Sequence, residues 1–241
     1  MLDAGNALLG YWLSQASGGA LVREAMDEMG YDAMAVGGLD LTLGVEALRA
    51  VADEASFSVL SANLVERETG RPVFAPYIVV HRGGIRLGVL GLTEDVALEG
   101  VPDGEAYEVL PYDATLSAYL DDVAAQSDVV VLLSHVGLYD DKLLAERFSA
   151  IDVIVGGRNA RRMVAPEIIG ETAIVQLGAR GEEMGLLRIA LGENLTPLAH
   201  EWRVMPLGPE YQEDADVSAL VHRYRQTIQP PTAVPTSETS P

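Results

Sequence analysis

The chain has 241 residues, of which 49% are hydrophobic, and this is enough to bury the core of one domain. Its 36 acidic residues outnumber 16 basic ones, so the net charge is -20 and the phosphate backbone of a nucleic acid would be repelled. Cysteine is absent, which excludes disulfides, thiolate metal sites and a cysteine nucleophile. The longest apolar runs, such as 129–133, are far shorter than the ~20 residues that cross a membrane.

Strand and helix patterns alternate along the first part of the chain, which predicts β-α-β units and a mostly parallel sheet. Residues 2–5 read as the end of a strand, so the start of the chain is expected to be truncated. Apolar residues at helical spacing follow over 21–29, and Gly30 predicts the end of that helix. The segments expected next are a strand at 33–36, a helix around 47–51 and a strand at 57–62.

The middle of the chain adds a hairpin to this alternation. Strand patterns at 77–81 and 85–92 flank a glycine-containing turn at 82–84. Asp113 is predicted to cap the next helix, and 128–133 reads as a strand buried on both faces. A hairpin among β-α-β units favours a sandwich of two sheets over one doubly wound sheet. The segments expected beyond it are a helix at 143–148 and strands at 151–155, 173–177, 185–191 and 199–205.

The last part of the chain is expected to leave the main domain. Residues 192–194 read as a turn, and Asp216 is predicted to begin a final helix. Beyond Gln229 the composition shifts to Pro, Thr and Ser, which is typical of disorder. We therefore expect a domain at 1–207, a helix at 208–229 that packs on the domain or leaves it, and a disordered tail at 230–241.

Several common site motifs are absent: the phosphate loop G-x-x-x-x-G-K-[ST], the dinucleotide fingerprint G-x-G-x-x-G after a strand, and the serine elbow G-x-S-x-G. Instead, glycine-containing turns directly follow four predicted strands. Ligands of α/β folds bind outside the carboxyl ends of the strands, so we expect these turns to converge on one crevice. A tight turn alone explains any single glycine, but four such turns indicate a site or the remains of one. The turns are 3–6, 37–40, 134–137 and 156–160.

The order of these turns resembles that of the 5′-nucleotidase branch of the metallophosphoesterases, in the calcineurin-like phosphoesterase superfamily. That family carries G-D after a strand, then G-N-H-[DE], S-H-x-G and G-G-H-[ST]-H. The resemblance extends from residue 1 to about Leu191. It implies a four-layer αββα sandwich of two mixed β-sheets flanked by helices, and two metal ions that activate water against a phosphorus centre. Further segments that look like family landmarks are 30–37, 61–64, 83–93, 151–157, 174–178 and 185–187.

The family's metal ligands are poorly matched in the first half of the chain. Aligned without gaps, the bridging aspartate of the family falls on Asn6. The metal-binding asparagine falls on Gly38, the assisting histidine on Leu39 and its acidic partner on Asp40. The neutral amide of Asn6 cannot offset the repulsion between two dications, and glycine has no side-chain donor atom. The opening D-x-H motif of the family has no counterpart.

In the second half, the family's ligands are matched at one position. The S-H-x-G histidine is retained as His135, whereas the G-G-H-x-H pair falls on Arg158 and Ala160. A guanidinium has no acceptor and a permanent positive charge, so it repels a metal cation. The resemblance therefore leaves Asn6 and His135 as remnant metal positions, with no catalytic residue and no cofactor expected.

These mismatches favour a domain that has lost two-metal phosphoester hydrolysis and serves as a binding or structural module. The alternative is a residual hydrolase of phosphoesters such as nucleotides. It would use a divalent metal (Mn, Zn, Mg or Ca) at His135 and N-terminal residues missing from this chain. His135 also fits a buried histidine without a ligand role, and Asp40 fits a turn cap. Other carboxylates fit helix starts or solvated positions, namely Asp140, Asp141, Asp214 and Asp216.

Three arginines, Arg158, Arg161 and Arg162, stand where the family holds a metal and its histidines. Guanidinium groups bind phosphate and carboxylate in a fork geometry, so one hypothesis is a direct arginine grip on an anion. The other is an exposed loop whose arginines pair with surface acids. The expected partners are accordingly a phosphate-bearing small molecule or a protein. Relatives in this family are commonly exported, which implies an extracytoplasmic (periplasmic or secreted) location.

Overall fold

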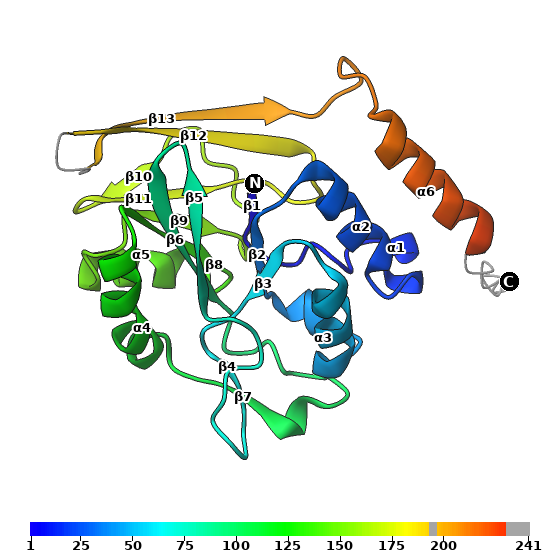
Figure 1. The fold of residues 1–241 in the computed structure, drawn as a ribbon, viewed down its shortest axis with the longest axis horizontal. Helices are drawn as coiled ribbons and strands as arrows, with labels where there is room; N and C mark the ends of the chain where they lie inside the picture. Colours follow the sequence, from blue (N-terminus) through cyan, green and yellow to red (C-terminus); the bar gives the residue numbers. More distant parts are fainter. Residues whose placement is uncertain (193–196, 230–241) are drawn as a thin grey trace, which may run out of the picture.

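The computed structural model describes residues 1–192 and 197–229. Within them the chain forms several β-sheets, and the two largest are flanked by helices (Figure 1). The strands are β1 (Leu2–Asp3), β2 (Ala33–Ala35), β3 (Ser58–Leu60), β4 (Leu64–Glu66), β5 (Tyr77–Arg82), β6 (Ile85–Leu92), β7 (Tyr107–Val109), β8 (Val129–Ser134), β9 (Val153–Gly156), β10 (Glu167–Ile169), β11 (Thr172–Gln176), β12 (Glu183–Leu191) and β13 (Pro197–Pro206).

The helices connect these strands or follow them. Among the described residues, each helix is too short or too polar to cross a lipid bilayer. The helices are α1 (Trp12–Ala16), α2 (Ala20–Met29), α3 (Val45–Glu54), α4 (Tyr112–Gln126), α5 (Leu138–Arg147) and α6 (Ala215–Thr227), with two 3-10 helices, η1 (Gly38–Leu41) and η2 (Gly104–Ala106).

Two sheets carry most of the strands. A three-stranded parallel sheet has the order β1-β2-β3, and a six-stranded mixed sheet has the order β10-β11-β9-β8-β6-β5. In the larger sheet β6, β8, β9 and β11 run parallel, while β5 and β10 are antiparallel edge strands. The predicted β5-β6 hairpin is confirmed. The parallel order brings the turns after β6, β8 and β9 to one edge of the sheet.

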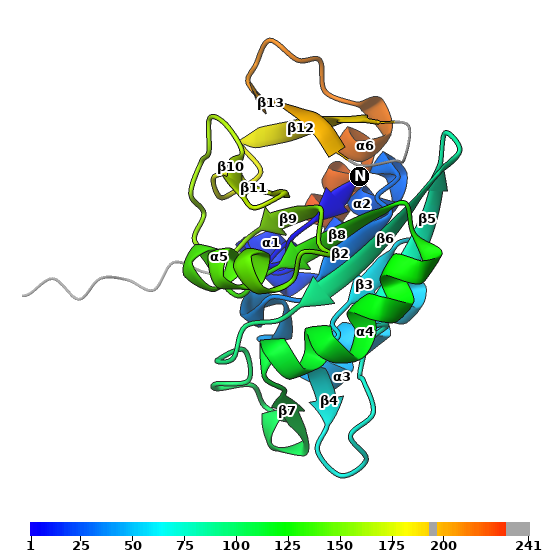
Figure 2. The same cartoon turned by 90° about the vertical axis from the view of Figure 1, so that its left-hand side faces the viewer.

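The sheets pack face to face, with helices outside them (Figure 2). Ala33, Ala35 and Leu60 of the smaller sheet share a buried core with Val89 and Val131 of the larger one. Buried residues of α4 and α5 pack on the outer face of the larger sheet, and those of α2 and α3 pack beside the smaller one. The expected four-layer αββα sandwich is therefore confirmed.

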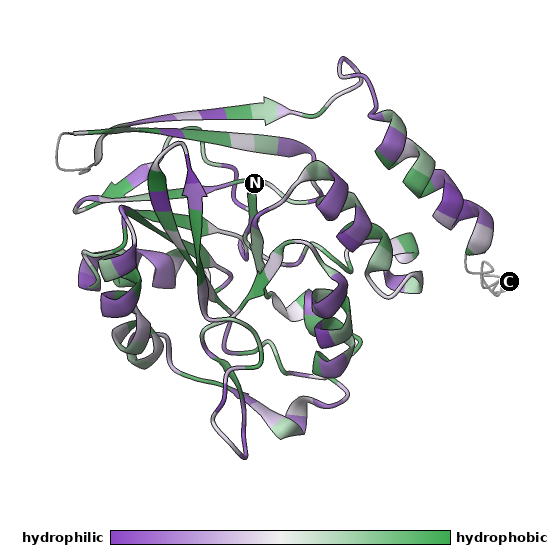
Figure 3. Ribbon diagram, in the orientation of Figure 1, coloured by the Kyte–Doolittle hydropathy of each residue, from purple (hydrophilic) through white to green (hydrophobic). Residues whose placement is uncertain are grey.

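The central strand β8 shows how the sequence specifies this layering. Successive side chains of a strand point to opposite faces of its sheet. Accordingly Val129, Val131 and Leu133 lie in the core between the sheets, and Val130 and Leu132 lie in the core under α4 and α5. Burial on both faces requires an uninterrupted apolar run, which is what was predicted here. Figure 3 shows the same contrast, with hydrophobic interior strands and hydrophilic outer faces of helices.

Two helix starts differ from the prediction. Pro111, not Asp113, occupies the residue before α4, where a missing N–H costs no hydrogen bond, and its carbonyl accepts from the backbone of Thr115 at 3.1 Å. The cap of α6 is Asp214, whose carboxylate accepts from the backbone N–H of Asp216 at 2.9 Å. Asp216 was therefore wrong as the starting residue, because the preceding aspartate has the capping geometry.

Helix α6 packs against α2. Leu220 is buried in a small cluster with Leu21, and the hydroxyl of Tyr224 donates to Glu24 at 2.7 Å. The carboxylate of Glu24 also pairs with Arg223. Of the segments predicted to be irregular, the tail at 230–241 and the end of the turn at 192–194 lie outside the described residues.

Candidate functional site

The turn after β1 is built around its own aspartate. Asp3 accepts a hydrogen bond from the backbone of Gly5 at 2.8 Å, which supports the left-handed conformations of Gly5 (φ 99°) and Asn6 (φ 62°). Burial raises the pKa of Asp3. The amide oxygen of Asn6, at the family's bridging position, accepts from the backbone N–H of Leu39 at 2.8 Å. This amide therefore ties the first turn to the second.

Asp40 clamps the same two turns from below the surface. Its carboxylate accepts backbone hydrogen bonds from Asn6 at 2.7 Å, Leu8 at 2.9 Å and Gly37 at 3.1 Å. The residue is 2% exposed, and burial raises the pKa of Asp40 to about 7 against the opposite effect of these hydrogen bonds. Asp40 thus makes the contacts of a turn cap, which is one of the two roles considered for it.

A carboxylate that the sequence interpretation missed, Glu94, lies in the turn after β6. Its Oε1 accepts from the backbone of Gly38 at 2.9 Å, and the residue is 6% exposed. A Cβ at position 38 would lie 2.8 Å from that oxygen, so the glycine fits the close approach. The one clue to Glu94 in the sequence was its position. It comes shortly after the end of a predicted strand, as the four recognised turns do. Its other oxygen, Oε2, has no partner among the described residues.

His135 follows β8 and is 1% exposed. Its Nδ1 lies 2.6 Å from the carbonyl oxygen of Ala4, and because a carbonyl only accepts, Nδ1 must carry the proton. Nε2 has no partner among the described residues. Glycines make room for the ring, since a Cβ on Gly157 would lie 2.7 Å from Nδ1 and 2.4 Å from the oxygen of Ala4. The histidine therefore ties the turn after β8 to the turn after β1.

The three arginines of the predicted anion site do not present three free guanidinium groups. Arg158 donates to the carbonyl of Val136 at 3.1 Å and lies 3.6 Å from the carboxylate of Asp95. Arg162 forms an ion pair with Glu183 at 2.5 Å. Arg161 is exposed. Two of the three arginines thus bind carboxylates of this chain.

The remaining turn after β9 is also held by the chain's own groups. Asn159 accepts from the backbone of Leu138 at 2.5 Å, at the start of α5. Ala160 adopts a left-handed conformation (φ 48°). With its amide oxygen facing the turn, Gln176 accepts from the backbone of Ala160 at 2.9 Å and of Asn159 at 3.1 Å. Neither Ala160 nor Arg158 offers an electron pair to a metal.

Asp141 differs from the solvated group that its sequence position allowed. It does lie in the first turn of α5, as predicted, but it is fully buried. Ser134 donates to its carboxylate at 2.5 Å, which fixes the start of α5 against the end of β8. Burial raises the pKa of Asp141 to about 7. Asp140, Asp214 and Asp216 lie at helix starts as expected.

These contacts bring the four predicted turns together, and they do not form a metal centre. Across residues 1–192 and 197–229, no three His, Cys, Asp or Glu side chains are placed to hold a metal ion. At the two remnant positions, the amide oxygen of Asn6 and Nδ1 of His135 already bind backbone groups, which leaves Nε2 of His135 as a single lone-pair donor without a partner among the described residues. Two divalent ions need several anionic or neutral lone-pair donors that face one point, and this edge does not present them. The residues present therefore do not fit the two-metal centre that the fold family implies.

Comparisons with known proteins agree with the fold, although no protein-family profile matches the chain. The layered sheets with turns at one edge define a metallophosphoesterase fold. A 5′-nucleotidase precursor from Thermus thermophilus superimposes with a TM-score of 0.86 and 29% identity, over 94% of this chain and 49% of that one. The chain is a homologue of the 5′-nucleotidases and related metallophosphoesterases, with the fold of their N-terminal domain.

Two other relatives widen this comparison. The sulfate thiohydrolase SoxB of Thermus thermophilus has a TM-score of 0.86 and 27% identity, over 94% of this chain and 42% of that one. An uncharacterized metallophosphoesterase of Bacillus subtilis, YunD, is 27% identical over 188 residues, which are 75% of this chain and 39% of that protein. The chain thus spans less than half the length of these relatives.

Proposed function

We propose that this chain is a metallophosphoesterase-fold domain that has lost two-metal phosphoester hydrolysis and works as a binding or structural module. The domain would span 1–207, with the segment 208–229 packed on it. The observation that carries the proposal is the use of the side chains at the turn edge. The amide oxygen of Asn6, the carboxylate of Asp40 and Nδ1 of His135 bind backbone groups of neighbouring turns.

Electrostatics at the same edge supports this proposal. In a two-metal hydrolase, bound cations link turns from different strands and polarise the phosphoryl oxygens. Here hydrogen bonds and the Arg158–Asp95 ion pair of the chain itself link those turns. A guanidinium at this edge would repel a dication that approached it.

The binding partner proposed for this module is a phosphate-bearing small molecule or a protein. Arg158 and Arg161 support an anion site, because the ion pair of Arg158 is a long one with the exposed Asp95 and Arg161 is exposed. Arg162 contributes less because Glu183 already binds it. Titration with inorganic phosphate and adenosine monophosphate tests this idea. Arg158→Ala should weaken binding, and Arg188→Ala, on β12 and paired with Glu201, is the charge-matched control.

We also propose an extracytoplasmic location. The family resemblance supports it, and one relative, a 5′-nucleotidase of the snake Gloydius brevicauda, is a venom protein that is 24% identical over 250 residues. Antibody labelling of intact and permeabilised cells of the source organism would test it. Labelling only after permeabilisation of the inner membrane would contradict the location.

A phosphatase assay tests the loss of hydrolysis. The substrates are p-nitrophenyl phosphate and adenosine monophosphate, with Mn²⁺, Zn²⁺, Co²⁺ or Mg²⁺ added, on this chain and on an N-terminally extended chain. We expect no metal-dependent turnover in either. Metal-dependent turnover that disappears in His135→Ala would replace this proposal with the residual hydrolase, in which His135 and N-terminal residues hold the ion.

A further inference from the structure

Strands β12 and β13 form a two-stranded antiparallel sheet of their own, which we call the ribbon. In Figures 1 and 2, β13 lies on the outer side of β12. The ribbon residues that pack against the core between the two main sheets are Leu187, Ile189 and Leu191, and all three belong to β12. One edge of β13 pairs with β12, and no described strand pairs with its other edge. That outer edge is therefore open to a further strand.

The hydrogen bonds of the ribbon show which residues of β13 face this open edge. Opposite residues of an antiparallel pair alternately exchange two backbone hydrogen bonds and none. Just beyond the strands, the N–H of Leu207 donates to the carbonyl of Glu182 at 2.8 Å, and this pair continues the register of the ribbon. Within 199–206, odd-numbered residues therefore bond to β12, and even-numbered residues direct their backbone groups outward. The outward residues are His200, Trp202, Val204 and Pro206.

Pro206 agrees with this assignment, because a proline has no N–H and within sheets is tolerated at such outward positions of edge strands. The side chains on either side of Trp202 carry opposite charges. Glu201 and Arg203 are 54% and 59% exposed and lie 3.3 Å apart on the same strand, and Glu201 also pairs with Arg188 of β12 at 3.3 Å. Exposed pairs of this kind contribute little to stability, so both groups can change partners at low cost.

We propose that β13 pairs with β13 of a second copy of this chain, in an antiparallel arrangement centred on Trp202. His200 of each copy then lies opposite Val204 of the other, so the outward N–H and C=O groups of all three residues are paired. The two ribbons become one four-stranded sheet. Glu201 of each copy lies opposite Arg203 of the other, at positions where the side chains of an antiparallel pair come closest.

The neighbouring registers are disfavoured by charge. An arrangement centred on Glu201 sets two glutamates opposite each other, and one centred on Arg203 sets two arginines opposite each other. Like charges at opposite positions destabilise a strand pair. The second of these registers also sets His200 against Pro206, which has no N–H to donate. The edge is therefore complementary to itself in one register, which is why a second copy is the partner that it fits. This pairing does not depend on the function of the turn edge.

Sedimentation velocity of the full chain from about 10 to about 500 μM tests the proposal, in ~0.15 M salt to screen the repulsion between chains of net charge -20. A strand pair of this length buries less than the ~1,200 Å² of a stable interface, so we expect a weak dimer with a dissociation constant of about 100 μM. Val204→Pro removes an outward N–H and leaves the bonds to β12 in place. It should weaken the dimer at least about tenfold, with an unchanged circular dichroism spectrum.

Charge reversals separate this pairing from general association. Arg203→Glu sets a glutamate opposite Glu201 of the other copy and should weaken the dimer at least about tenfold. Adding Glu201→Arg to it restores opposite charges and should return the dissociation constant to within about threefold of the parent. Arg225→Glu, at an exposed position of α6, changes the net charge equally and should have less than about a threefold effect.

Four results would overturn the proposal. The parent could stay monomeric at about 500 μM, or Val204→Pro could dimerise as well as the parent. The double reversal could fail to recover what Arg203→Glu loses. Finally, Arg225→Glu could weaken the dimer as much as Arg203→Glu, which would mean that only net charge controls the association.

Discussion

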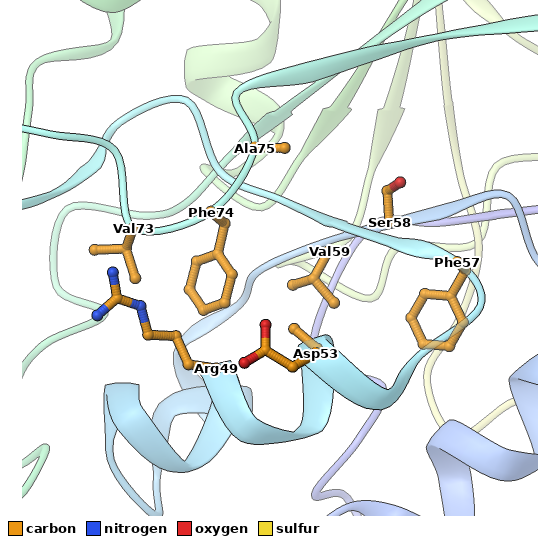
Figure 4. Close-up of a pocket in the computed structure, with 9 residues that line it drawn as sticks. Arg49, Asp53, Phe57, Ser58, Val59, Val73, Phe74 and Ala75 are labelled. Atoms are coloured by element: carbon orange, nitrogen blue, oxygen red, sulfur yellow. The ribbon is translucent and has the colours of Figure 1, made fainter.

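The turn edge and the α3 pocket, a hollow of about 460 Å³ between α3 and β3 (Figure 4), both have charged side chains beside a sheet, but these charged groups have different partners. At the turn edge, Asp40 accepts three backbone hydrogen bonds and His135 is bound to a carbonyl. At the pocket, Asp53 is exposed and binds no other described residue. The comparison shows that the type of side chain alone does not define a ligand site. Its polar atoms must also lack hydrogen-bond partners within the protein.

The largest effect expected at the turn edge is the loss of the Asp40 clamp. Asp40→Ala leaves the backbone N–H groups of Asn6, Leu8 and Gly37 buried without an acceptor, and each such group costs about 1–3 kcal/mol. We therefore expect the free energy of unfolding to fall by about 3 kcal/mol or more in urea denaturation. Asp53→Ala is the control and should change it by less than ~0.5 kcal/mol. Similar small losses in both variants would remove the distinction between the two regions.

A smaller loss is expected from crowding between the turns. In Gly157→Ala the new Cβ would lie 2.4 Å from the oxygen of Ala4 and 2.7 Å from Nδ1 of His135, so backbone must shift. We expect a loss of about 2 kcal/mol in the free energy of unfolding. Gly10→Ala, where a Cβ has nothing within 4 Å, should be within about 0.5 kcal/mol of the parent. If Gly157→Ala left the free energy of unfolding unchanged, the turns would be packed more loosely than described.

The buried Asp141 predicts a pH dependence of stability. Its folded-state pKa of about 7 lies above the ordinary value of 3.8, so between these pH values the folded state holds a proton that the unfolded state has released. The free energy of unfolding should therefore fall as the pH rises from about 4 to about 7. Asp141→Asn should flatten this fall by about 1 kcal/mol or more, because the amide does not titrate in this range. If the free energy of unfolding, measured by urea denaturation, changed with pH in the same way in parent and variant, the raised pKa of Asp141 would be contradicted.

The smallest effect is expected for the ion pair that crosses the turn edge. Arg158 and Asp95 are 3.6 Å apart, and the side chain of Asp95 is 71% exposed. Such surface pairs contribute little, so Arg158→Ala should change the free energy of unfolding by less than ~1 kcal/mol. A loss as large as that of Asp40→Ala would show that the arginine is a main structural tie at this edge.

Much of the fold could be predicted from periodicity. The apolar run of β8, the β5-β6 hairpin and the Gly30 helix stop all have signals that a sequence displays. The short strands β4, β7 and β10 were missed, because each has only three residues and one of them is a glutamate, so neither an apolar run nor a clear alternation is visible.

The site was predictable in position but not in its contacts. Glycines after strands located the turns, because close approach of turns requires them. Glu94 was missed, and Asp141 was not expected to be fully buried, because both partnerships join residues from different elements. A linear sequence shows which residues follow a strand, but it does not show which backbone groups their side chains will meet.

The central claim is that most polar side-chain atoms of the turn edge bind the fold, and that those left without a described partner, such as Nε2 of His135 and Oε2 of Glu94, are too few to hold two metal ions. Thermal unfolding of the full chain in EDTA and in about 1 mM Mn²⁺, with metal analysis of the dialysed protein, tests it most directly. We predict the same unfolding temperature in both conditions and no retained metal. Two ions retained per chain, with a raised unfolding temperature that is lost in His135→Ala, would contradict the account.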